Sequence, residues 1–187
     1  MDYVKLYDLE NYLFEVVHPR FVREKQLSAF DFFCIVVWKA NRAKSRVANL
    51  LLAKGEQGRE DLDAIVKSLT ASLACAESEE ARMRILIEDW RFRLPIASAI
   101  LTVLWPENFT VYDVRVCDQL GNHHCVQNKT AFVAIWRGYR AYLDDVKKQE
   151  PTFPALRDKD RTLWAKSFEK QLTDDIATCF RKSNESS

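Results

Sequence analysis

The chain has 187 residues, of which 48% are hydrophobic and 29% are charged, and its formal net charge is +1. A disordered protein would need lower hydrophobicity or a larger net charge, and the four glycines exclude a collagen-like or glycine-linker protein. The length suffices for a full hydrophobic core. We therefore expect a single compact unit over residues 1–187, with two helical lobes around a cleft as the alternative.

No apolar run approaches the roughly 18 to 20 residues that a membrane-spanning helix needs. The longest candidate, 30–38, contains Asp31 and is followed directly by Lys39. The first residues also lack the charged and then apolar layout of a signal peptide. We expect a cytoplasmic protein, or a nucleoid or nuclear one, that has no membrane partner.

The five cysteines are scattered and odd in number, and no two of them form a Cys-x-x-Cys pair. This pattern favours reduced thiols. Cys117 and Cys125, together with His123 and His124, could form a partial metal site, but a structural zinc ion needs four closed ligands. We expect neither a metal ion nor another cofactor.

Apolar residues recur at helical spacing through the first part of the chain. The first predicted helix starts near Leu9 and ends at His18-Pro19, because a proline disfavours helical backbone in the residue before it. Ser28 is expected to cap one long helix over 29–54, and Gly55 to end it.

The rest of the chain is predicted to be helical as well, with an irregular stretch at 109–112 and a frayed tail at 182–187. Asp113 is expected to cap a short helix that Gly121 ends. The remaining helices are expected over 61–76, 78–93, 95–104, 130–148 and 158–181. Because no convincing strand pair is present, the predicted fold class is all-α.

Charge is unevenly distributed along the chain. Range 20–54 holds eight basic and two acidic residues, a net charge of +6, whereas 55–81 holds two basic and seven acidic residues, a net charge of −5. Ranges 82–93 and 129–148 are again positive, at +2 and +3. Segregated charge can bind a polyanion although the total is near zero. Ordinary solvated helix faces are the alternative interpretation.

The most informative stretch is 94–116, LPIASAILTVLWPENFTVYDVRV. It resembles the helix-hairpin-helix superfamily of base-excision DNA glycosylases, which includes endonuclease III and the adenine and oxidised-guanine glycosylases. In that family a Leu-Pro pair and a tight hairpin precede an apolar helix, here 97–104. A Pro/Phe loop follows, here with Pro106 and Phe109, and then the catalytic aspartate, here Asp113. The resemblance implies a two-lobed helical fold.

The resemblance gives Asp113 a catalytic role. Cleavage of an N-glycosidic bond leaves positive charge on the sugar, which a nearby carboxylate stabilises while it orients the attacking water. The helix that begins after Asp113 favours the negative charge of this carboxylate. A plain N-cap aspartate is the alternative.

The sequence departs from the family pattern in three respects. No glycine lies between Gly58 and Gly121, so the Gly-x-Gly hairpin that grips a DNA phosphate is shortened or replaced near 95–98. Bifunctional members carry a lysine near the start of the second hairpin helix, where this chain has Arg-Leu-Pro at 93–95. That difference argues against Schiff-base lyase chemistry from this position. The four-cysteine iron–sulfur loop is also missing.

A flipped base needs an aromatic pocket and polar groups for its edge. Trp38 and Arg42 would share a helix face, with Lys39 beside them as a further candidate for an amine nucleophile. A core tryptophan next to a solvated basic face is the alternative. The substrate-pocket candidates are Trp38, Lys39, Arg42, Tyr112 and Trp136. The DNA-binding candidates are Arg46, Arg91, Arg93, Ile96, Ala97, Ser98, Arg115 and Lys129.

The sequence therefore favours a monomeric, monofunctional DNA glycosylase that hydrolyses the bond to a damaged or modified base and leaves an abasic site. Its partner would be DNA with such a base, either in base-excision repair or in defence against modified foreign DNA. A non-catalytic DNA-binding module on the same scaffold is one alternative. A helical protein-interaction domain with no DNA role is another.

Overall fold

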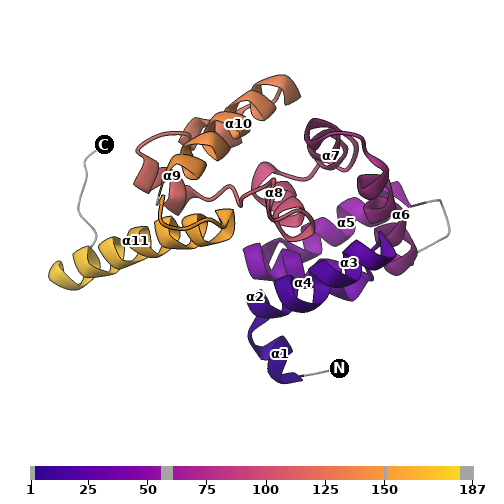
Figure 1. The fold of residues 1–187 in the computed structure, drawn as a ribbon, viewed down its shortest axis with the longest axis horizontal. Helices are drawn as coiled ribbons and strands as arrows, with labels where there is room; N and C mark the ends of the chain where they lie inside the picture. Colours follow the sequence, from indigo (N-terminus) through magenta and orange to yellow (C-terminus); the bar gives the residue numbers. More distant parts are fainter. Residues whose placement is uncertain (1–2, 56–60, 150, 182–187) are drawn as a thin grey trace.

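The computed structural model describes residues 3–55, 61–149 and 151–181, and every regular element within these ranges is helical (Figure 1). The all-α prediction is therefore confirmed for the described residues. The predicted tail at 182–187 lies outside them. In the same ranges, no helix combines the length and the apolar character that crossing a bilayer requires.

The first helices run on past the proline that was predicted to stop them. After α1 (Tyr3–Tyr7) come α2 (Leu9–Tyr12), a π-helical stretch η1 (Leu13–Val17) and α3 (His18–Glu24). Pro19 lies in the first turn of α3, directly after η1. The π stretch changes the backbone hydrogen-bond register at a point where a missing N–H is tolerated. The predicted end at His18-Pro19 is wrong, and the helix ends at Lys25, whose φ is +58°.

The predicted helix over 29–54 is interrupted once. The Ser28 hydroxyl caps α4 (Ala29–Ala40) by accepting a hydrogen bond from the Asp31 amide at 3.1 Å. Ala40 then leaves the helical region, with φ −160° and ψ 84°, and a 3₁₀ turn (η2, Asn41–Ala43) leads into α5 (Lys44–Lys54). The break corrects the prediction that Trp38 and Arg42 share a face, because that relation needs a continuous helix.

The next helices form as predicted, apart from one boundary. Asp61 caps α6 (Leu62–Cys75), and Ser78 caps α7 (Glu79–Arg84). A second π stretch, η3 (Ile85–Asp89), continues α7, but the helix ends there and not at 93. The cause is local, since Arg91 adopts a left-handed conformation with φ +58°.

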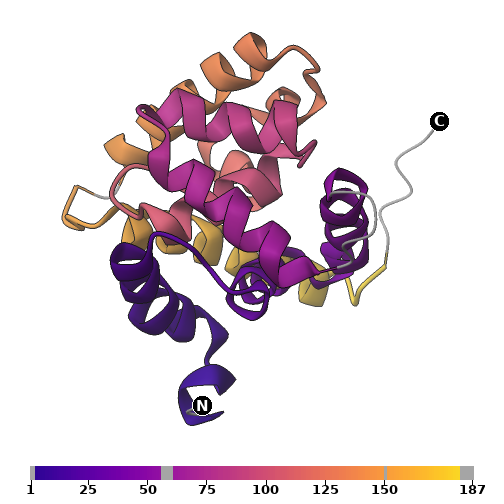
Figure 2. The same cartoon turned by 90° about the vertical axis from the view of Figure 1, so that its right-hand side faces the viewer.

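Helix α8 (Leu94–Leu104) lies at the centre of the molecule. All of its residues except Pro95 are buried, as expected for a helix that is apolar around its whole circumference. In Figure 1, α8 separates the N-terminal helices from α9 (Val114–Leu120), α10 (Phe132–Lys148) and α11 (Leu156–Ala177). A 3₁₀ stretch, η4 (His124–Asn128), precedes α10. Figure 2 shows α11 crossing the middle of the fold between α10 and the first helices.

The irregular segment 109–112 is held in place by buried hydroxyl groups. The Tyr139 hydroxyl donates to the Thr110 carbonyl at 2.8 Å and accepts from the Thr110 amide at 3.1 Å. Tyr142 donates to the Val111 carbonyl at 2.7 Å, and the Ser98 hydroxyl accepts from the amide of the next residue at 2.9 Å. These hydrogen bonds provide partners for the buried amide and carbonyl groups of the extended segment. They also fix the position of Asp113, which follows it.

Candidate functional site

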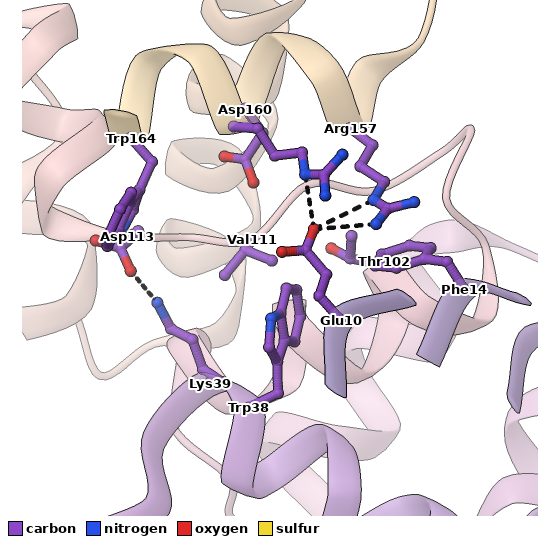
Figure 3. Close-up of a pocket in the computed structure, with 11 residues that line it drawn as sticks. Glu10, Phe14, Trp38, Lys39, Thr102, Val111, Asp113, Arg157, Asp160 and Trp164 are labelled. Carbon is purple, nitrogen blue, oxygen red and sulfur yellow. Dashed lines mark hydrogen bonds and ion pairs between the residues drawn. The ribbon is translucent and has the colours of Figure 1, made fainter. Parts of the chain in front are cut away.

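A cavity of about 460 Å³ opens between the N-terminal helices and α11 (Figure 3). This volume lies in the range typical of small-molecule sites. Side chains from α2, η1, α4, α8, α11 and the segment 111–113 line it. The lining residues are Glu10, Phe14, Trp38, Lys39, Thr102, Val111, Asp113, Arg157, Asp160, Arg161 and Trp164.

Asp113 lies at the start of α9 and uses its two carboxylate oxygens differently. Oδ1 accepts the Arg115 amide hydrogen at 2.9 Å, so Asp113 is the predicted N-cap. Oδ2 faces the cavity and pairs with the Lys39 ammonium of α4. The side chains of this pair are 21% and 12% exposed. Most of the water is therefore excluded from the pair, while its edge stays open to a ligand.

A second ionic group lies across the cavity from Asp113. Glu10 of α2 accepts a hydrogen bond from Arg157 of α11 at 3.2 Å and forms an ion pair with Arg161 of the same helix at 2.9 Å. The Arg157 guanidinium also lies over the ring of Phe14, 3.9 Å from its centroid. These contacts join α2 to α11 and close this end of the cavity.

The cavity has an aromatic wall. Phe14 and Trp38 meet edge to face, with ring centroids 6.1 Å apart. Thr102 and Val111 extend the lining with small side chains. Near Asp113, Trp164 is 42% exposed and stacks on Phe168 at an interplanar angle of 8°. Aromatic surfaces of this kind suit a flat ring such as a nucleobase.

Asp160 projects from α11 into the same cavity, between Asp113 and Glu10 (Figure 3). Its Oδ1 is buried next to the Thr110 hydroxyl, although the two atoms do not form a hydrogen bond of normal geometry. Burial raises the pKa of Asp160 to about 7, and the Asp113 and Glu10 carboxylates act in the same direction. The Lys39 ammonium and the Thr110 hydroxyl oppose the shift. Asp160 is therefore able to hold or release a proton near neutral pH.

Two of the five substrate-pocket candidates line this cavity. Trp38 and Lys39 do, whereas Arg42 is exposed in the turn after α4. Tyr112 is 2% exposed, and its hydroxyl donates to the His123 carbonyl at 2.7 Å, so it belongs to the packed interior. Trp136 stacks on a buried tyrosine of α10, away from the cavity.

The predicted DNA-binding residues at 96–98 lie in the first turns of α8, and the structure corrects this prediction. Ile96, Ala97 and Ser98 are buried, so their side chains are not available to DNA. The amides of Ile96 and Ala97 both donate to the Arg93 carbonyl, at 3.0 Å each. An amide that already has a partner inside the helix is not free to grip a phosphate. The phosphate clamp is therefore missing at these residues.

The basic candidates lie on the surface. Arg46, Arg91, Arg93 and Lys129 are exposed. Arg115 is partly buried, and its guanidinium lies 5.3 Å from the ring centroid of Trp164 at the mouth of the cavity. Among the DNA-binding candidates, Arg115 therefore contacts a residue that lines the cavity.

Asp160, Trp164 and the Glu10–arginine group are not among the site residues predicted from the sequence. One signal for Asp160 was available. Leu156, Leu163 and Ser167 are buried, and Asp160 falls on the same helical face. An acidic residue on a buried face indicates either a partner or a function.

The two histidines of the suggested partial metal site have other partners. His123 pairs with Asp145 at 2.9 Å, and His124 pairs with Asp118 at 2.7 Å. Across the described ranges, no three histidine, cysteine, aspartate or glutamate side chains come together as metal ligands.

Comparison with protein-family models, with curated proteins and with solved structures finds no match to the chain. The functional argument therefore depends on the chemistry of the cavity and on the sequence resemblance at 94–116.

Proposed function

We propose that the protein is a DNA glycosylase that hydrolyses the N-glycosidic bond of a damaged or modified base. The observation that carries the proposal is the position of Asp113. This residue, which the sequence resemblance selects, lines the same cavity as an aromatic wall and a buried carboxyl group. Three carboxyl groups around one opening, one of them with a raised pKa, are typical of a functional site.

In this proposal the sugar of the flipped nucleotide lies at the Asp113 end and its base lies deeper, against Trp38 and Phe14. As the C1′–N bond lengthens, positive charge develops on the sugar, and the Asp113 carboxylate stabilises it. The same carboxylate accepts a proton from the water that attacks C1′. Basic side chains near the mouth, Arg115 in particular, would hold the backbone phosphates.

The position of Lys39 in the cavity suggests a second candidate function. If Lys39 loses its proton, its amine could attack C1′, form a Schiff base and give lyase activity. In the structure the Lys39 ammonium forms an ion pair with the Asp113 carboxylate, and an ammonium is not a nucleophile. We therefore propose hydrolysis as the principal reaction. Trapping with borohydride separates the two, since only the amine route links protein to DNA covalently.

The proposal is tested with a panel of duplex and single-stranded oligonucleotides that each carry one modified base. After incubation, alkali cleaves the strand wherever an abasic site has formed. We expect strand cleavage of at least one member only after alkali treatment. Cleavage of no member would contradict the proposal and favour a non-catalytic module.

A further inference from the structure

The three carboxyl groups of the cavity differ in their partners. Asp113 is paired with Lys39, and Glu10 is paired with Arg157 and Arg161. Asp160 lies between them, and no cation of the described residues forms an ion pair with it. Its Oδ1 is buried at the cavity wall beside the Thr110 hydroxyl, with no hydrogen bond of normal geometry between the two. A carboxyl group placed in this way has a neutral neighbour in place of a cation.

We propose that Asp160, in its neutral acid form, is a catalytic residue that donates a proton to the base as it leaves. This inference rests on the proposed function and deepens it. Its position supports the role, because Asp160 projects into the same cavity as Asp113 and its Oδ1 is covered. A sugar held by Asp113 leaves its base within this cavity, on the side of Asp160.

The reaction balances with these two residues and one water molecule. The C1′–N bond breaks, its electron pair goes to the base, and a nitrogen or oxygen of the base takes the proton of Asp160. The water oxygen bonds to C1′ and gives one proton to Asp113. Exchange with solvent then returns a proton to Asp160 and removes one from Asp113. The products are the free base and an abasic sugar, and both carboxyl groups return to their starting states.

The surroundings of Asp160 keep the acid form available. Lys39 of α4 and the Thr110 hydroxyl oppose protonation, while Asp113 and Glu10 favour it. From α10, the phenols of Tyr139 and Tyr142 face it, and burial raises the pKa of both far above neutrality. These phenols therefore stay uncharged near pH 7. With burial as the main cause, the pKa of Asp160 is about 7.

The test measures the single-turnover rate of abasic-site formation from pH 5.5 to 9, on whichever oligonucleotide of the panel the parent protein cleaves. A required acid predicts that the parent rate falls about tenfold per pH unit well above pH 7. Asp160→Asn keeps the size of the side chain but cannot transfer the proton. We expect it to be at least about 100-fold slower at pH 6 and to lose the fall at high pH. Asp174→Asn, an exposed change on the same helix, should match the parent.

Three outcomes overturn the inference. If the parent rate does not fall between pH 7 and 9, no such acid acts in the slow step, and this result needs no variant at all. If Asp160→Asn folds and keeps the parental rate and pH profile, Asp160 is not the donor, while the proposed function stands. If the parent releases no base from any oligonucleotide, the proposed function fails and the inference fails with it.

Discussion

The Lys39 ammonium lies against the Asp113 carboxylate, although 74 positions of sequence separate the two residues. One group comes from the end of α4 and the other from the cap of α9, so the pair joins the N-terminal helices to the C-terminal ones at the cavity. A half-buried ion pair at this point both positions the Asp113 carboxylate and offsets its charge. Substrate that displaces Lys39 would release that charge toward the sugar.

The ion pair is expected to stabilise the fold. Lys39→Met removes the cation and leaves the Asp113 carboxylate poorly solvated, which should lower the free energy of unfolding by roughly 1 to 3 kcal/mol. Urea unfolding of Lys39→Met, Asp113→Asn and the double variant isolates the coupling between the two. A coupling of zero would show that the contact contributes nothing to stability. Lys44→Met, at an exposed site in the next helix, is the matched control.

Asp160 makes stability depend on pH. Its folded-state pKa of about 7 is above the ordinary aspartate value, so between roughly pH 4 and 7 the folded state binds a proton that the unfolded state has lost. Stability from this group is therefore full below pH 4, is lost as pH rises through 7, and then stays low. Asp160→Asn removes the dependence and should raise the free energy of unfolding at pH 8 by roughly 1 to 4 kcal/mol relative to the parent.

The measurement is thermal or urea unfolding of the parent and Asp160→Asn at pH 5, 6.5 and 8. The difference between the two proteins should grow with pH. The quantity compared is the stability of Asp160→Asn minus that of the parent. If this difference stays constant or falls between pH 5 and pH 8, the pKa of Asp160 is not raised. Stability is measured without DNA, so this prediction is independent of the proposed activity.

The Tyr139 hydroxyl is expected to hold the segment that leads to Asp113. Tyr139→Phe leaves both the amide and the carbonyl of Thr110 buried without this partner. The expected cost is about 1 to 3 kcal/mol of unfolding free energy. Tyr7→Phe, at a site that is 94% exposed, should change stability by less than about 0.5 kcal/mol. Equal stability of Tyr139→Phe and the parent would show that water replaces the bonds.

Local signals predicted most of the helices. Residue type and spacing predict Ser28 and Asp113 as caps, and each side chain accepts a backbone hydrogen bond in the structure. The errors fall where the chain changes hydrogen-bond register. Neither the π stretch before Pro19 nor the 3₁₀ turn after Ala40 follows from residue periodicity, because both depend on how the helices pack.

The candidate site was only partly predictable. Asp113 was predicted from the family resemblance at 94–116. Trp38 and Lys39 were predicted from a segment that combines aromatic and basic residues. The cavity itself arises where α11 crosses α2 and α4, and no local pattern states which helices meet. Asp160 carried a weak signal as an acid on a buried helical face. Its importance depends on what it faces, which is a tertiary property.

DNA binding should be sensitive to salt. The exposed basic residues predict that the affinity for an unmodified duplex falls at least about tenfold between roughly 50 and 200 mM salt. Arg93→Ala should reduce the slope of log affinity against log salt by about one if this residue contacts a phosphate. Fluorescence anisotropy gives both values. A weak DNA affinity that does not change with salt concentration would favour a protein-interaction domain.

The most direct test of the central claim compares abasic-site formation by the parent and by Asp113→Asn on the same modified duplex. Asparagine still caps α9 but carries no charge, so folding should be kept. The account predicts a rate at least about 100-fold lower, with duplex affinity close to that of the parent. Asp118→Asn, at an exposed site in α9, should keep the parental rate. A parental rate in Asp113→Asn would contradict the claim that this carboxylate drives the reaction.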